Sequence, residues 1–309
     1  MTLGLDNTLR LLQLAVPALL GAGCGALRLF PDPRAAVVVL NRYALYIGFP
    51  ALVARGLLLP SAVIPGQPVF WLLWPLALTL MLLGVPRARD SALGLGMTFG
   101  NVAYLGLPYV LAVMGEGMAG PAALAVAVHV TGAVTVGPAL LARASGVQGG
   151  ALEIIRRVAG QPLFWAPAAG LAMRASSPDL RTAAADVLEP FAASAAVIAL
   201  FLLGLHVFTE RTRLRSISAA VLGLVAARML LAPALVLGLA WAAVTLGWLP
   251  AELARVHVLL AAMPLAITTF SMAHDAGVEA DRVAAAVVVS SLLAALMLPL
   301  WAMLASGLG

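Results

Sequence analysis

The sequence predicts an all-α integral membrane protein with about ten transmembrane helices. Hydrophobic residues make up 63% of the 309 residues, charged residues make up only 10%, and the mean hydropathy is +1.05. Globular proteins average about 25% charged residues, because they need a polar coat around the core. A chain this apolar must bury much of its surface in lipid. This excludes a soluble enzyme, a secreted disulfide scaffold and a disordered regulator.

Ten apolar stretches approach the length of about 20 residues that a membrane-spanning helix needs. Turn-forming or charged residues end most of them, such as the Pro-Asp-Pro-Arg sequence at 31–34. The polar stretch 176–186 is expected to be a loop. The first five spans are Leu9–Leu29, Ala35–Leu59, Pro68–Val85, Ser91–Gly115 and Gly120–Ala142. The second five are Val158–Ala175, Val187–Phe208, Ile217–Gly247, Ala251–Asp275 and Asp281–Ser306.

The net charge of +5 comes from arginine, which supplies all 18 basic residues. The arginines are scattered among loops rather than gathered on one face, so we expect no binding to nucleic acid. Short loops rich in arginine face the cytoplasm. The loops after the odd-numbered spans would therefore be cytoplasmic, and both termini would lie on the outer side of the inner membrane. These loops hold Arg28, Arg34, Arg87, Arg89, Arg143, Arg156, Arg157, Arg211, Arg213, Arg215 and Arg282.

The two halves of the chain show signs of an internal repeat. Pro17 precedes Gly25 by eight residues in the first span, and Pro162 precedes Gly170 by the same interval in the sixth. Because each half has an odd number of spans, the second half must enter the membrane inverted, as in many secondary transporters. The sequence thus predicts a first five-helix repeat at residues 1–143, a cytoplasmic linker at 144–157 with a short amphipathic piece, and a second repeat at 158–309.

The fourth and ninth spans carry residues that interrupt a helix near its middle. The interrupting residues are Gly100, Asn101, Gly106 and Pro108 in the fourth span and Pro264 in the ninth, which Thr268, Thr269 and Ser271 follow. Broken helices at membrane depth occur only where protein or a water-filled cavity satisfies the freed backbone groups. The positive N-termini of the half-helices favour anions. Two ordinary proline kinks without a ligand role are the alternative.

Segments spread along nearly the whole chain resemble, in order, those of the auxin efflux carrier family. This family includes plant PIN-type carriers and bacterial malate permease-like proteins. The fourth span carries the resemblance most clearly, through Phe99-Gly100-Asn101, Leu105-Gly106-Leu107-Pro108 and Met114-Gly115. Further matching segments are Leu40–Arg42, Phe49–Leu52, Leu200–Gly204, Arg228–Pro233 and Ala261–Pro264. The chain departs from the family at Gln161-Pro162, where Asn-Pro is frequent, and at Thr269, where plant carriers have a second proline.

The resemblance implies ten helices in two inverted five-helix repeats, with helices four and nine crossing at their breaks. Helices one, two, six and seven would form a scaffold, and the other helices would form a moving transport domain. The substrates of the family are small organic anions.

Eight residues are candidates for substrate binding: Asn41, Asn101, Tyr104, Pro108, Arg228, Pro264, Thr268 and Thr269. The amide of Asn101 can donate to a carboxylate, or it can cap the broken backbone. The hydroxyls after Pro264 can bind a ligand, or they can bond back to carbonyls of their own helix. Asn41 faces the site region in the family pattern, although it can equally join two helices.

Arg228 is an arginine inside a span, where a charge is costly and usually functional. It can hold an anion, pair with Glu189 or with a half-helix C-terminus, or reach toward the cytoplasmic face. His129, central in the fifth span, is a candidate for a proton or hydrogen-bond relay; a neutral histidine bonded to a neighbouring helix is the simpler alternative. His257 lies nearer the end of its span and has less weight.

The sequence therefore predicts a secondary transporter, not an enzyme, that moves small organic anions such as carboxylates across the inner membrane by alternating access. A sodium/bile-acid-type symporter or a cation antiporter of related architecture is the alternative, which the lack of Asp or Glu near the breaks disfavours. A membrane enzyme or a receptor without flux is the alternative from another class. We expect no cofactor and no metal. The coupling ion and a homodimer remain open at this point.

Overall fold

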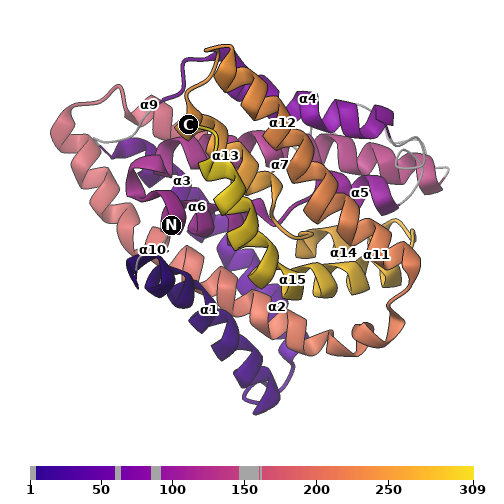
Figure 1. Ribbon diagram of the computed structural model, residues 1–309. Coiled ribbons are helices and arrows are strands. Elements are labelled where there is room, and N and C mark those ends of the chain that lie inside the picture. The colour runs from indigo at the N-terminus through magenta and orange to yellow at the C-terminus, as the bar shows by residue number, and fades with distance from the viewer. Residues whose placement is uncertain (1–4, 60–63, 85–91, 146–159, 161) are drawn as a thin grey trace. The chain divides into compact units, whose positions relative to one another are not determined.

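The computed structural model describes residues 5–59, 64–84, 92–145, 160 and 162–309, and these are almost entirely helical (Figure 1). The predicted all-α class is therefore confirmed. Five stretches are long and apolar enough to cross a membrane: Pro33–Leu58, Glu116–Gly137, Pro178–Thr209, Ala219–Thr245 and Ala280–Ser306. Shorter apolar helices are Ala15–Ala26, Pro68–Gly84 and Val102–Met114. The exact set of ten spans in an inverted repeat stays a prediction.

The helices gather into two compact units, each of which draws on both halves of the chain. Unit 1 comprises Met1–Ile64, Ala103–Ala127 and Gln161–Arg211, and unit 2 comprises Pro65–Val102, Val128–Gly160 and Thr212–Gly309. Unit 1 thus contains the helices that the family resemblance assigns to the scaffold. The units are a different division from the predicted repeats, whose boundaries stay predictions. The amphipathic piece expected in the linker lies outside the described residues.

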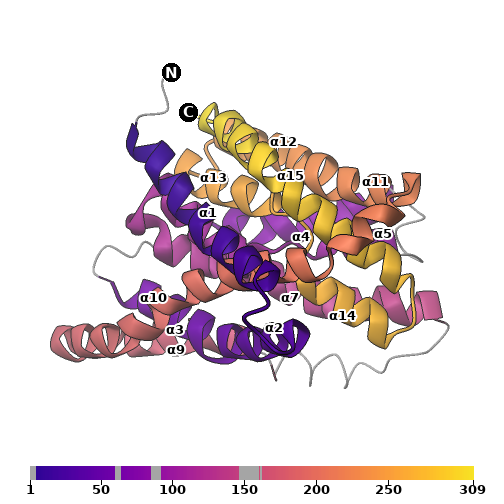
Figure 2. The same ribbon diagram turned by 90° about the horizontal axis from the view of Figure 1, so that it is seen from below.

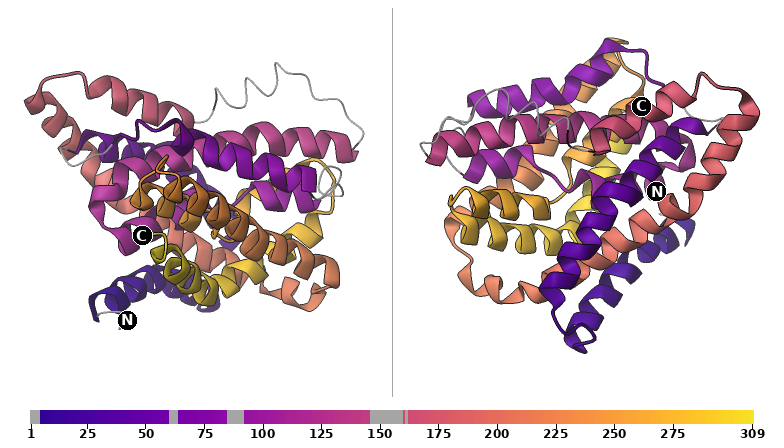
Figure 3. Two further views of the ribbon diagram at one scale, coloured as in Figure 1. Left: turned by 45° about the horizontal axis from the view of Figure 1, so that its top comes forward. Right: turned by 180° about the vertical axis from the view of Figure 1, so that it is seen from behind.

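Unit 1 is organised by the packing of its first helix along its longest one. Helix α1 (Leu5–Ala26) lies against α10 (Pro178–Thr209), as the right-hand view of Figure 3 shows. A Cβ atom on Gly204 of α10 would lie only 1.7 Å from the carbonyl oxygen of Ala18, so glycine is what permits this approach. The remaining helices of unit 1 are α2 (Pro33–Tyr43), α3 (Phe49–Leu58), α6 (Leu107–Met114) and α9 (Pro162–Met173).

The polar stretch 176–186 is helical, so the expectation of a loop there is wrong. Helix α10 begins at Pro178, and the Ser177 hydroxyl caps it by accepting a bond from the backbone N–H of Leu180 at 3.4 Å. Serine at the cap, proline at the first helical position and Asp179 in the first turn all favour a helix start. Because these signals are polar, they resemble a loop when hydropathy alone is considered.

Unit 2 contains a second set of helices, of which α12 (Ala232–Thr245) and α15 (Ala280–Ser306) run alongside each other (Figure 2). The indole of Trp301 on α15 donates to the carbonyl of Met229, in the segment Ala227–Leu231 just before α12, at 2.9 Å. The other helices are α4 (Pro68–Gly84), α5 (Ala92–Thr98), α11 (Ala219–Ala226), α13 (Ala251–Ala261) and α14 (Ile267–Asp275). Helix α7 (Ala119–Ser145) begins in unit 1 and continues into unit 2.

Within the described residues, three π-helical segments interrupt the α-helices, and each lies just before a proline. They are Ala44–Gly48, Val102–Gly106 and Ala227–Leu231, and the prolines that follow are Pro50, Pro108 and Pro233. A proline cannot donate its N–H and its ring clashes with the carbonyl four residues earlier. A widened turn absorbs this conflict without ending the helix. Pro108 therefore does not break the fourth span as predicted, but lies near the start of α6.

Candidate functional site

The two predicted helix breaks lie against each other in unit 2. The fourth span is interrupted between Thr98 and Val102, and the ninth is interrupted between Ala261 and Ile267. The backbone N–H of Asn101 donates to the carbonyl of Pro264 at 2.8 Å, and the N–H of Ala266 donates to the carbonyl of Phe99 at 3.1 Å. Gly100 and Leu265 thereby form an antiparallel bridge. Each break thus satisfies backbone groups that the other leaves free.

Ser290 of α15 completes this crossing. Its hydroxyl is buried and accepts the backbone N–H of Leu265 at 3.1 Å. Ser290 was not among the residues expected from the sequence, although a hydroxyl in an otherwise apolar run is a signal for such a contact. We use the term crossing for residues 99–101 and 262–266 together with Ser290.

Arg228 is completely buried and turns its guanidinium toward the crossing. Its Nε donates to the carbonyl of Met263 at 2.8 Å, Nη1 donates to Met97 at 3.1 Å, and Nη2 donates to Leu260 at 3.3 Å. Met97 and Leu260 belong to the last turns of α5 and α13, which carry the negative ends of the half-helix dipoles. The contact with a half-helix C-terminus, one of the roles that the sequence left open for Arg228, is therefore the one that the structure shows.

Two further roles expected for Arg228 are wrong. The side chain does not reach toward the membrane surface, because it is 0% exposed. It does not pair with Glu189, which pairs instead with Arg55, both in unit 1. Gly100 explains how the guanidinium fits, since a Cβ atom there would lie 1.7 Å from Nη2 of Arg228. Direct contact between Arg228 and a substrate stays a prediction.

Asn101 has a buried side-chain amide that remains free for a ligand. The residue is 1% exposed, and neither Nδ2 nor Oδ1 has a hydrogen-bond partner among the described residues. Only its backbone N–H joins the crossing, so the side chain does not cap the broken backbone. An unpaired buried amide costs about 1–3 kcal/mol. Such groups in a native fold call for an explanation, and a bound ligand is one.

The hydroxyls after Pro264 are less available to a ligand than the side-chain amide of Asn101. The hydroxyl of buried Thr269 donates to the carbonyl of Ala266, close by in the same segment, which is the simpler role that the sequence left open. Thr268 is half-buried at the start of α14. Pro264 provides the carbonyl that receives Asn101. Binding of substrate by these three residues stays a prediction.

Two further candidates meet in unit 1. The hydroxyl of Tyr104 donates to Oδ1 of Asn41 at 2.5 Å, and the Tyr104 ring lies edge-on to Phe49 at a centroid separation of 4.9 Å. Tyr104 belongs to the π-helical segment before Pro108, and Asn41 lies close before another such segment. Unit 1 thus brings together two of the residues that the sequence nominated, and it also contains Pro108.

His129 does not make the expected interhelical hydrogen bond. Its ring stacks on Trp74 of α4 at a centroid separation of 3.9 Å and an angle of 11° between the planes, and both ring nitrogens lack a partner among the described residues. The ring of His257 of α13 lies 5.8 Å from that of His129, and it also lies beside Phe70 of α4, whose backbone it contacts. From the sequence, His257 had little weight as a residue near a span end. His257 lies only two turns before Pro264, and this spacing was the sequence signal that His257 lies deep within its span.

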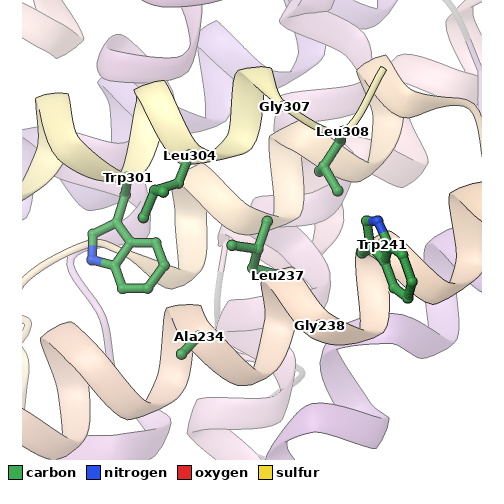
Figure 4. Close-up of a pocket in the computed structure, with 8 residues that line it drawn as sticks. All are labelled: Ala234, Leu237, Gly238, Trp241, Trp301, Leu304, Gly307 and Leu308. Atoms are coloured by element: carbon green, nitrogen blue, oxygen red, sulfur yellow. The ribbon is translucent and has the colours of Figure 1, made fainter.

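A hollow of about 420 Å³ lies between α12 and α15 in unit 2, and its lining differs from the crossing. Figure 4 shows Leu237, Trp301, Leu304 and neighbouring residues around this space. Its lining is apolar apart from the indole nitrogens and the backbone, and it includes none of the predicted site residues. It offers no charged group that would bind a carboxylate.

The fold and the crossing define a multi-pass membrane protein with paired broken helices. Comparison with known proteins finds a matching family and a similar protein. Residues 151–302 match the family described as "Membrane transport protein". A protein of Rhizobium meliloti (strain 1021) named "Putative malonate transporter" is 28% identical over 288 residues, which is 86% of each chain.

The second half of the chain thus matches this membrane transport family, and the protein is a transporter rather than an enzyme. The resemblance to auxin efflux carriers and malate permease-like proteins, drawn from the segments around Asn101 and Pro264, is confirmed.

Proposed function

We propose that the chain is a permease that carries small carboxylates, dicarboxylates among them, across the inner membrane by alternating access. The observation that supports this most directly is the free amide of Asn101, buried in a crossing of two broken helices that the guanidinium of Arg228 holds together. The termini and the arginine-rich loops take the orientation expected from the sequence.

A carboxylate suits this crossing better than a cation does. Nδ2 of Asn101 donates to one carboxylate oxygen, and the start of α14, where Ala266 provides no side-chain cap, offers the positive end of a helix dipole. The charge of Arg228 is screened only weakly in a buried setting, so it favours an anion nearby and opposes sodium. A cation antiporter would have to overcome this field.

Unit 2 contains the whole crossing, and it also contains Arg228. It can therefore carry a bound anion as one body while unit 1 serves as the scaffold, which is the form of alternating access common among transporters with broken helices.

Exchange of labelled malonate in proteoliposomes tests the proposal. Malonate is the first probe because the relative from Rhizobium meliloti is named for it, and succinate, malate and an aromatic monocarboxylate complete a panel of unlabelled competitors. We expect exchange of malonate that at least one of these acids inhibits. Absence of exchange with every acid, tested in turn as the labelled species, would contradict the proposal and favour a receptor without flux.

Asn101→Ala is the matching variant. Loss of an amide-to-carboxylate bond is worth about 1.5–3 kcal/mol, or roughly ten- to a hundredfold in affinity. Gln67→Ala is the control, because Gln67 is another amide of unit 2 whose Oε1 is unpartnered but which lies outside the crossing. Equal loss in both variants, or none in Asn101→Ala, would place the binding site elsewhere.

A further inference from the structure

His129 and His257 form a buried pair of imidazoles that the proposed anion site does not use. The rings lie 5.8 Å apart with an angle of 21° between their planes. Within the described residues neither nitrogen of His129 has a hydrogen-bond partner, and His257 has only the backbone of Phe70 beside it. The side-chain nitrogen of Trp74, which stacks on His129, is also buried and unpartnered. Unpaired polar atoms gathered in one buried place are costly for stability alone.

We propose that His129 and His257 are an intramembrane proton-binding pair, and that the proton they take up crosses the membrane together with the carboxylate. The second part rests on the proposed function, whereas the first part does not. The pair binds a single proton on a ring nitrogen, and no other bond forms or breaks.

The surroundings of the pair favour the binding of a single proton by the two rings. The ring of His129 lies on the face of Trp74 at 3.9 Å, and an indole face attracts an adjacent cation. Protonation of one imidazole opposes protonation of the other because like charges repel at this separation, so the two rings titrate as a unit. A proton, alone or on one bridging water, fits between two rings where a larger cation does not.

The charged groups that face the pair are few. Among the described residues it is Arg228 that approaches it, since its guanidinium carbon lies 5.7 Å from the centre of the Trp74 ring. Helices α4 and α12, which pack against α13, carry no titratable side chain, and α15 carries Asp281 and Arg282 only at its start. On α13 itself, Glu252 and Arg255 lie in the first turns, before His257.

This arrangement couples the proton to the anion. The positive charge of Arg228 opposes a proton on the pair, and a carboxylate in the crossing offsets that charge. Anion and proton therefore favour each other's binding, and by linkage the effect is the same in both directions.

The first experiment asks whether the pair binds a proton, without any substrate. The fluorescence of Trp74 is taken as the difference between the full-length protein and its Trp74→Phe variant in liposomes, over a pH series. An imidazolium stacked on an indole quenches it, so we expect a fall in Trp74 fluorescence as pH is lowered. His129→Gln and His257→Gln should each abolish this step, and His274→Gln, at the exposed end of α14, should keep it. A flat titration in the unsubstituted protein, or a step that survives in His129→Gln, overturns the proposal.

The second experiment asks whether the proton travels. In proteoliposomes with an alkaline interior and no membrane potential, the protein should accumulate labelled malonate, by up to about tenfold per pH unit for one coupled proton. His129→Gln and His257→Gln should lose accumulation but keep malonate exchange at equal pH on both sides. Exchange without accumulation in the unsubstituted protein refutes the coupling and leaves the proposed function intact. Absence of all malonate exchange counts against the proposed function, and the fluorescence titration then still decides whether the pair exists.

Discussion

At the scale of single residues, Arg228 and Asn101 show opposite behaviour within one crossing. Arg228 directs its donors to three carbonyls, whereas the side chain of Asn101 has no partner among the described residues. One residue therefore holds the two breaks together, and the other is available to a ligand. Their sequence positions alone would not separate these roles, because both are polar residues inside apolar spans.

Arg228→Met should unfold the protein rather than merely weaken transport. The change leaves three buried carbonyls without their charged donor, a defect of the kind that costs about 3–5 kcal/mol. Arg228→Lys keeps the charge but cannot reach three carbonyls in one plane, so it should be intermediate. Thermal unfolding in detergent measures both. A stable Arg228→Met protein that only fails to bind malonate would mean that Arg228 binds the substrate and does not hold the two breaks together.

The partners of these residues show what the sequence could not supply. Asn101 and Pro264 were identifiable because residues that break a helix are rare in apolar spans. Ser290 and His257 were not, because their partners lie on other helices and no local pattern specifies which face of a helix meets the crossing. The destination of Arg228 was open for the same reason, since burial of a guanidinium does not say which carbonyls it will meet.

At the scale of elements, the prolines after the π-helical segments differ from the proline at the crossing. Pro264 lies where a helix ends and pairs with another break, whereas Pro108 follows a widened turn and the helix continues. The sequence predicted a break in each span, and in the fourth span it counted Pro108 among the interrupting residues together with Gly100 and Asn101, where the break lies. A proline signals a backbone conflict, and the surrounding structure decides whether a wide turn or a crossing resolves it.

Pro108→Ala should let the π-helical segment Val102–Gly106 relax to an α-helix. Loss of the extra residue in that turn rotates the preceding residues by about 100°, which turns Tyr104 away from Asn41. We expect transport to fall while the protein stays folded, with slower hydrogen exchange across the segment. Pro75→Ala in α4, where no π-helical segment precedes the proline, is the control. Unchanged exchange and normal transport in Pro108→Ala would show that the wide turn does not depend on this proline.

At the scale of the whole molecule, the division into units cuts across the order of the sequence. Each unit takes helices from both halves, so a linear search for domains finds the predicted boundary at 144–157 and misses the units. The presence of helices that are apolar enough to cross a membrane is readable from composition, because lipid imposes it. The assignment of a helix to a unit depends on contacts between distant segments, which hydropathy does not encode.

Topology gives the prediction at this scale. In a background with Cys24→Ala, a cysteine at Glu116 should react with an impermeant thiol reagent added outside intact cells, and a cysteine at Arg215 should react only after the cells are opened. Both positions are exposed, so reagent access is not limited by packing. The expected pattern follows from the arginine-rich loop around Arg215 facing the cytoplasm. The reverse pattern would contradict the arginine distribution as a guide to orientation here.

The contacts of Arg228 with both breaks also determine when the crossing can form during synthesis. Met97 and Arg228 are 131 residues apart, and Met263 follows Arg228 by a further 35. At about 5–20 residues per second these groups leave the ribosome roughly 10–30 s apart. The seven-residue helix α5 is too short to cross a bilayer alone and ends in open carbonyls until then. The nascent fourth span must therefore be sheltered, by the insertion machinery or a chaperone, until its partners arrive. If synthesis stops before Arg228, the backbone groups of the first break have neither Arg228 nor the ninth span as partners. The crossing therefore forms late in the assembly of the protein.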